Sequence, residues 1–283
     1  MKRFDRIKLD FTRNWNLPGK QRLSNLLKPS REFKNSIKDG ITWLTAENIA
    51  IYANADSYIE WQILSSGTYE DEINKLIRTS LKAGENALDV GGNIGLQSIR
   101  MSQQAGDAGK VLAFEPMAHL QERFKLNIAL NKCSNVQLLP YALSTEEKTT
   151  VFKIDTEAWN QGNFSLRPNQ SGTITQEVLI KAGDDLNEIK SLTSLALIKI
   201  DVEGFENQVI QGLSNTIRKH LPRIIFEYDV NYWTINGQDI NDCYRFLAGI
   251  GYSFFQIVEV GCERIMAAEA IVSGNLFCMP NER

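Results

Sequence analysis

The chain has 283 residues and a formal net charge of −3, and 43% of its residues are hydrophobic and 23% charged. These values are ordinary for a globular protein, so they exclude general disorder and give no global case for nucleic-acid binding. The length suits one large domain with an extension. We divide it into an extension over residues 1–66 and a domain over residues 67–283.

The N-terminal extension is basic. Residues 1–38 carry eleven Lys or Arg against three acidic residues. Such a segment could bind an anionic glycan, a membrane surface or RNA, although a solvated extension is the simpler interpretation. It is too charged for a signal peptide, and no apolar run approaches the roughly 20 residues needed to cross a bilayer. The four cysteines form no zinc or disulfide pattern, so we expect a cytoplasmic protein without stable membrane insertion.

The elements follow from hydrophobic periodicity. Residues 37–53 suit a small hairpin, and Tyr69–Leu81 reads as an amphipathic helix that Gly84 ends. Short apolar runs then alternate with helical patterns, which is typical of a parallel sheet covered by helices on both faces. The seven expected strands are Ala87–Gly91, Val111–Glu115, Val136–Ala142, Leu195–Val202, Arg223–Tyr228, Phe254–Val260 and Asn275–Met279. The expected helices between them are Leu96–Gln104, Leu120–Leu130, Glu206–Lys219 and Ile240–Ile250.

One stretch interrupts this alternation. Thr149–Ile154 and Gln176–Lys181 read as an inserted β-hairpin around a polar loop. Loops above strand ends often carry specificity, so Asn163 and Ser165 are candidates for binding an acceptor. Two aromatic residues that follow the fifth strand, Trp233 and Tyr232, are further candidates because they could stack on a sugar, although such aromatic residues more often belong to the core.

The first strand ends in a glycine-rich turn, Asp89-Val90-Gly91-Gly92-Asn93-Ile94-Gly95. Glycine permits positive φ and close approach of a ligand. A dinucleotide site needs G-x-G-x-x-G, and this pattern fails from either Gly91 or Gly92. The spacing D-x-G-x-x-x-G, with acidic Asp89 in front, instead suits the cationic sulfonium and ammonium groups of S-adenosylmethionine. About 20 residues on, Glu115 ends the second strand, where a carboxylate can bind both ribose hydroxyls.

The fourth strand carries three charged residues on one side. Because side chains alternate along a strand, Lys199, Asp201 and Glu203 should share a face near its C-terminal end. Buried charges must be paired or line a wet cleft, and Glu227 ends the next strand at a similar height. We take Asp201, Glu203 and Lys199 as the catalytic candidates, with Asp201 the first choice to orient or deprotonate an acceptor hydroxyl, and Glu227 as an acceptor-binding residue. A network that only braces the strand ends stays open, and a divalent metal is a weaker alternative because the spacing prescribes no ligand set.

Together these residues resemble the FkbM family of S-adenosylmethionine-dependent methyltransferases. The similarity lies in the Asp89–Gly95 turn, in Phe114-Glu115-Pro116 and above all in the segment Lys199–Glu206, and it spans about residues 67–280. Three further segments show weaker similarity to the family: Gly67–Glu70, Gly162–Leu166 and Asn275–Pro280. The sequence departs from the family at Gly92, where alanine is more usual.

The resemblance implies a class I methyltransferase (Rossmann-like) fold of the α/β class. It also implies that Tyr69 and Glu70 close over the cofactor. The complete set of expected cofactor-binding residues is Tyr69, Glu70, Asp89, Gly91, Asn93, Gly95, Glu115, Pro116, Ala142 and Asp201. The expected activity is methyl transfer to a hydroxyl of a small molecule or glycan. An RNA methyltransferase or N-methyltransferase, a non-catalytic assembly protein of the same fold and a homodimer stay open as alternatives, with nucleic acid the less favoured partner.

Overall fold

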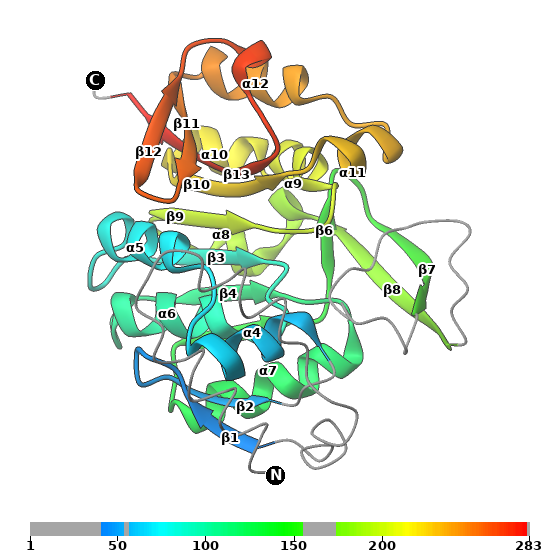
Figure 1. Cartoon of the computed structure of the whole chain (residues 1–283). Helices are drawn as coiled ribbons and strands as arrows, with labels where there is room; N and C mark the ends of the chain where they lie inside the picture. The colour runs from blue at the N-terminus through cyan, green and yellow to red at the C-terminus, as the bar shows by residue number, and fades with distance from the viewer. Residues whose placement is uncertain (1–40, 54–56, 155–173, 282–283) are drawn as a thin grey trace.

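A computed structural model describes residues 41–53, 57–154 and 174–281. Asn163 and Ser165 lie outside these ranges. The centre of the fold is an eight-stranded sheet of order β12-β11-β13-β10-β9-β3-β4-β5 (Figure 1). Its strands are β3 (Ala87–Val90), β4 (Val111–Phe114), β5 (Val136–Leu139), β9 (Leu197–Ile200), β10 (Arg223–Tyr228), β11 (Tyr252–Val258), β12 (Gly261–Ile265) and β13 (Gly274–Pro280). Neighbouring strands from β5 to β10 are parallel. Beyond β10, each strand is antiparallel to the one before it: β13 to β10, β11 to β13 and β12 to β11.

Helices cover both faces of this sheet, as the alternating sequence pattern predicts. They are α4 (Tyr58–Ser66), α5 (Asp71–Ser80), α6 (Leu96–Ala105), α7 (Ala118–Leu130), α8 (Asn187–Lys190), α9 (Glu206–Gly212), α10 (Ser214–His220), α11 (Val230–Ile235) and α12 (Ile240–Gly249). The described chain also has two short 3₁₀ turns, η1 (Gly183–Asp185) and η2 (Ala268–Ala270). Within the described ranges, no helix combines the length and apolar character needed to cross a membrane.

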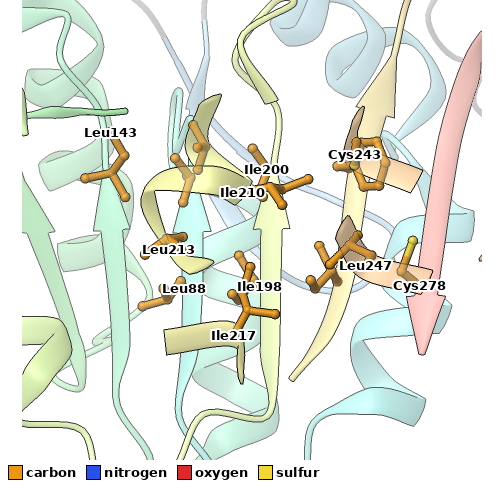
Figure 2. Close-up of a cluster of buried hydrophobic side chains, with 14 of the residues drawn as sticks. Leu88, Leu143, Ile198, Ile200, Ile210, Leu213, Ile217, Cys243, Leu247 and Cys278 are labelled. Atoms are coloured by element: carbon orange, nitrogen blue, oxygen red, sulfur yellow. The ribbon is translucent and has the colours of Figure 1, made fainter. Parts of the chain in front are cut away.

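Alternation along the central strands divides the core into two layers. Leu88, Ile198 and Ile200 point to one face, where they pack with side chains of α9, α10 and α12 (Figure 2). Leu197 points to the other face, where it packs with Ile73 and Met101 of α5 and α6. Lys199 follows Leu197 by two residues and therefore lies on this second face, which confirms the expected separation of charged and apolar side chains along β9.

The segment before the sheet is an integral part of the packing. Strands β1 (Ile41–Leu44) and β2 (Ala50–Ala53) form the expected hairpin, and β2 packs on α7. Ile51 and Trp61 share a buried cluster with Ile94 and Leu96 of the domain. A division at residue 67 stays a prediction, and the side chains on either side of it pack in one core.

The predicted strand Val136–Ala142 and helix Glu206–Lys219 are each two elements. Pro140, which lacks a backbone N–H, ends β5, and the chain continues as β6 (Ala142–Ser144) in a separate sheet with β7 (Lys148–Ile154) and β8 (Ile174–Ala182). The helix divides after Gly212, where a Cβ atom would lie 1.9 Å from the carbonyl oxygen of Ser144. This close approach seats α9 on β6.

Candidate active site

A cavity of about 380 Å³ opens where the parallel strands β3, β4, β9 and β10 end. The carboxyl ends of parallel strands meet at one edge of a sheet, so residues far apart in sequence converge there. Ten of the expected site residues line this cavity, namely Tyr69, Glu70, Gly91, Asn93, Glu115, Pro116, Ala142, Asp201, Glu203 and Glu227. Asp89, Lys199, Gly95 and Trp233 are outside its lining.

The glycine-rich turn has left-handed backbone at three positions. Gly91, Asn93 and Gly95 have φ angles of 87°, 49° and 90°. Gly91 lies so close to β9 that a Cβ atom there would be 1.9 Å from the carbonyl oxygen of Asp201, and the Asp201 N–H donates to Val90 at 2.9 Å. Glycine is therefore required at 91 both by the backbone angle and by space. Gly95 instead begins α6 and faces Phe124.

Glu115 points into the cavity in a fixed orientation. One carboxylate oxygen accepts a hydrogen bond from the Asn93 N–H at 2.9 Å, and the other accepts one from the Met117 N–H at 2.8 Å. The residue is 4% exposed. Burial raises the pKa of Glu115 to about 7, although the two backbone donors oppose the rise. Each oxygen keeps a lone pair for a further donor, such as a ligand hydroxyl.

Lys199 is a buried cation beneath the cavity. Its ammonium contacts the Asp201 carboxylate at 3.0 Å, and its side chain is 7% exposed. Burial disfavours this charge, but the carboxylates of Asp201, Asp89 and Glu70 outweigh burial and raise the pKa of Lys199. Lys199 therefore neutralises acidic groups from three separate parts of the chain.

Asp89 itself is fully buried and is only partly satisfied. Ser98 Oγ donates to its Oδ2 at 2.5 Å, and burial raises its pKa. In the described chain its Oδ1 has no hydrogen-bond partner. A buried acceptor without a partner is costly, and such atoms are expected near ligand sites.

A group of carboxylates forms the other half of the cavity. Ile225 and Phe226 pair with Lys199 and Ile200, so Glu227 stands beside Asp201 on the neighbouring strand. Burial, followed by repulsion from Asp201, raises the pKa of Glu227 to about 8 and that of Glu203 to about 9. Glu203 occupies a turn with φ of 56°, because Glu206 accepts the backbone N–H groups of Val202 and Gly204.

Raised carboxyl pKa values predict a pH-dependent stability. The pKa of Glu203 is higher in the folded chain than in the unfolded one, so its stabilising effect is complete below the unfolded pKa and is lost as pH rises through about 9. Glu203→Gln should therefore flatten the fall in melting temperature between about pH 5 and pH 9. Melting curves across this range test it against Glu259→Gln, a change at an exposed site. Parallel curves for Glu203→Gln and the wild type would contradict it.

The wall formed by Tyr69 and Glu70 is attached to α6. Gln97 Nε2 donates to the Glu70 carboxylate at 2.7 Å, and Arg100 Nη1 donates to the Tyr69 carbonyl at 2.8 Å. The same guanidinium, which is buried, forms an ion pair with the half-buried Glu47 at 2.5 Å. Glu70 has a left-handed φ of 52°, which these contacts stabilise. These contacts fix the position of residues 69–70 relative to α6, the helix that follows the glycine-rich turn.

Trp233 does not face the cavity. Its side chain is 1% exposed and packs with Phe226 and Tyr228 in the core, so its predicted position beside a sugar is wrong. Tyr232, the other aromatic candidate, does line the cavity. Adjacent residues on a helix point in different directions, and α11 is too short to show periodicity.

Helix α4 contributes residues that the sequence interpretation does not include. Tyr58 and Ile59 line the cavity, as do Phe205 and Gln208 near the start of α9. Helix α4 has polar and apolar residues on all sides, so no amphipathic stripe marks it. Its ends do carry a signal, since Ser57 caps the Glu60 N–H in an S-x-x-E pattern and Gly67 ends the helix in left-handed backbone.

Residues 89–254 match the model of the methyltransferase FkbM domain, which is more than half of the chain. The chain belongs to the FkbM methyltransferase family. It is an enzyme with a class I methyltransferase fold, in which the large, mostly parallel sheet carries the site at its strand ends. The curated proteins that the chain resembles are also named as methyltransferases. The chain is 25% identical over 188 residues to methyltransferase 1 of Beauveria bassiana, a match covering 60% of this chain and 74% of the relative.

Two further comparisons cover a smaller share of the other protein. A hexuronic acid methyltransferase, AglP of Haloferax volcanii, is 27% identical over 149 residues, which cover 53% of this chain and 58% of AglP. A solved structure of methyltransferase FkbM from Methylobacillus flagellatus is 11% identical with a TM-score of 0.45, covering 77% of this chain and 52% of that protein. The chain thus spans about half the length of that solved protein.

Proposed function

We propose that this FkbM methyltransferase transfers the methyl group of S-adenosylmethionine to a hydroxyl oxygen of a small molecule or glycan. The observation that carries the proposal is the single cavity into which Glu115 and Asp201 both project, beside the turn begun by the buried Asp89. Its two halves differ in chemistry. One combines a backbone turn with an oriented carboxylate, and the other gathers acidic and aromatic side chains.

The residues of the first half suit the cofactor. Glu115 would accept the ribose hydroxyls, and Met117 and Leu120, which also line the cavity, offer apolar surface for the adenine. The acidic groups around Asp89 would favour a cation, and the unpartnered Asp89 Oδ1 indicates a region that is incomplete without a polar neighbour. When bound there, the cofactor supplies an electrophilic methyl group on sulfur.

The second half would hold the acceptor. Attack by a hydroxyl oxygen needs close contact and removal of its proton. Asp201 forms an ion pair with Lys199, which fixes its carboxylate, so it would orient the hydroxyl. Glu227, beside it with a pKa of about 8, is better matched to accept a proton near neutral pH. Glu203 and Tyr232 would contact the remainder of the acceptor.

The glycan assignment draws support from AglP, whose name describes a sugar-acid substrate. Carboxylates and an aromatic side chain are also common partners for sugar hydroxyls and ring faces. A divalent metal is a weaker candidate, since among residues 41–53, 57–154 and 174–281 no group of three or more His, Cys, Asp or Glu is placed to hold one.

Two measurements test the function. Isothermal titration of the purified, folded chain with S-adenosylhomocysteine should show binding. Incubation with S-adenosylmethionine labelled in its methyl group should transfer label to a small-molecule or glycan fraction of a cell extract, with mass spectrometry locating the methyl on oxygen. No binding would reject the cofactor. Label in RNA or on nitrogen would favour the alternative methyltransferases, and binding without transfer to any fraction would favour a non-catalytic role.

Glu115→Ala should weaken S-adenosylhomocysteine binding by roughly 10- to 150-fold, because it removes a charge-assisted contact of about 1.5–3 kcal/mol to the ribose. Titration calorimetry measures the change. Glu122→Ala, at an exposed position of α7, is the matched control and should bind as the wild type does. Equal affinities for the two variants would remove Glu115 from the binding site.

A further inference from the structure

Helix α7 contacts the glycine-rich turn through two side chains that lie outside the cavity lining. Phe124 packs directly against it, since a Cβ atom on Gly92 would lie 2.9 Å from Phe124 Cε2, and one on Gly95 would lie 3.1 Å from Cδ2. Asn127 lies almost one helical turn further along and is fully buried. These contacts tie the conformation of the turn to α7.

The Asn127 amide joins two otherwise separate parts of the chain. Its Nδ2 donates to the carbonyl oxygen of Ile94 at 2.8 Å, inside the glycine-rich turn. Its Oδ1 accepts the N–H of Tyr52 in β2 at 2.7 Å. A buried amide with both ends bound has one stable orientation, because either flipped or rotated state would leave polar atoms unsatisfied.

Asn131, one turn further along α7, provides a natural comparison. Its Oδ1 accepts the Ala50 N–H at 2.9 Å, and its Nδ2 donates to the Ala50 carbonyl at 2.6 Å. Both asparagines therefore bind the edge of β2, as a neighbouring strand would. Asn127 is the one of the two that also bonds to the glycine-rich turn.

Ile94 stands between two residues with left-handed backbone, Asn93 and Gly95. The Asn93 N–H donates to Glu115, so the position of the Gly92–Asn93 peptide group determines the orientation of the Glu115 carboxylate. Uncommon backbone conformations persist where surrounding contacts over-determine them. We propose that Asn127 is a positioning residue for cofactor binding, which acts by holding the Ile94 carbonyl and thereby the Asn93–Glu115 contact. The inference rests on the proposed cofactor.

The test compares Asn127→Leu with Asn131→Leu in the full chain. Each leucine is close in size to asparagine and removes the bonds to β2, so both variants should lose thermal stability. Asn127→Leu alone should also weaken S-adenosylhomocysteine binding, by about tenfold, measured by calorimetry well below both melting temperatures. Asn131→Leu should stay within about twofold of the wild type. Equal affinities for the two variants would overturn the proposal.

A second variant keeps the test decisive if Asn127→Leu does not fold. In Asn127→Asp the introduced carboxyl can donate to Ile94 while it is protonated, but it repels that carbonyl once ionised. Relative to the wild type, S-adenosylhomocysteine affinity should therefore be retained at low pH and lost as pH rises. A constant ratio of affinities across pH would contradict the proposal. Failure of the wild type to bind would instead reject the cofactor itself.

Discussion

Lys199→Met should lower the free energy of unfolding by about 3 kcal/mol, the lower end for removing one partner from a buried ion pair, because Lys199 is buried but the Asp201 side chain is 31% exposed. The variant leaves Asp201 without its cation, and Asp89 and Glu70 lose the same neutralising charge. Methionine fills much of the lysine volume, so the loss is electrostatic rather than a cavity effect. Chemical denaturation at neutral pH measures it.

The matched control is Lys148→Met, which removes an ion pair with Glu146 in which both side chains are at least half exposed. Exposed pairs contribute roughly 0–1 kcal/mol, so this variant should stay near the wild type. Lowering the pH should reduce the difference in free energy of unfolding between Lys199→Met and the wild type, because protonation neutralises the carboxylates that lost their cation. Equal stability of the two variants would show that Lys199 does not neutralise the cluster.

Gly91→Ala should prevent formation of the glycine-rich turn. The added Cβ atom would overlap the Asp201 carbonyl at 1.9 Å, and a backbone atom cannot move aside as a flexible side chain can. We expect a loss of at least about 4 kcal/mol in stability, or a chain that does not fold. If it folds, binding of S-adenosylhomocysteine should fall by more than about tenfold, because β3 and β9 must separate.

Gly251→Ala separates the two causes of that loss. Gly251 has a similar φ of 91°, and among the described residues nothing lies within 4 Å of the point that a Cβ atom would occupy there. This control should lose only the roughly 1–2 kcal/mol that left-handed backbone costs alanine. Denaturation curves for both variants measure the difference, and similar losses would mean that the approach of β9 to Gly91 is not tight.

The sequence predicts the central strands well because buried parallel strands are short, continuous apolar runs. The strands β3, β4, β9 and β10 all lie where these runs indicate. Strand β12 is absent from the predicted strands, since four of its five residues are exposed and polar or small, so no apolar pattern marks this sheet edge. The break after Gly212 is not predicted either, because it depends on contact with β6, which is distant in sequence.

Some site residues could likewise be predicted from their own strand, whereas the role of others depends on contacts with residues distant in sequence. Glu115, Asp201 and Glu227 could be placed together because each closes a parallel strand and such strands end at one edge. The pairing of Lys199 with Asp201, rather than its exposure to a ligand, depends on burial by helices on the second face. The contribution of Tyr58 depends on how α4 packs against the rest of the domain, which no local pattern specifies.

The stretch that matches the family model begins at Asp89 and the weaker resemblance reaches back to Gly67, whereas Tyr58 and Ile59 stand upstream of both in the cavity wall. The binding chamber is therefore assembled from two sources, one common to the family and one supplied by the preceding chain. Exchanging the upstream part between relatives would alter the shape offered to the acceptor while leaving Gly91 and Glu115 in place. Choice of acceptor can diverge along this route without any change in the nucleoside half.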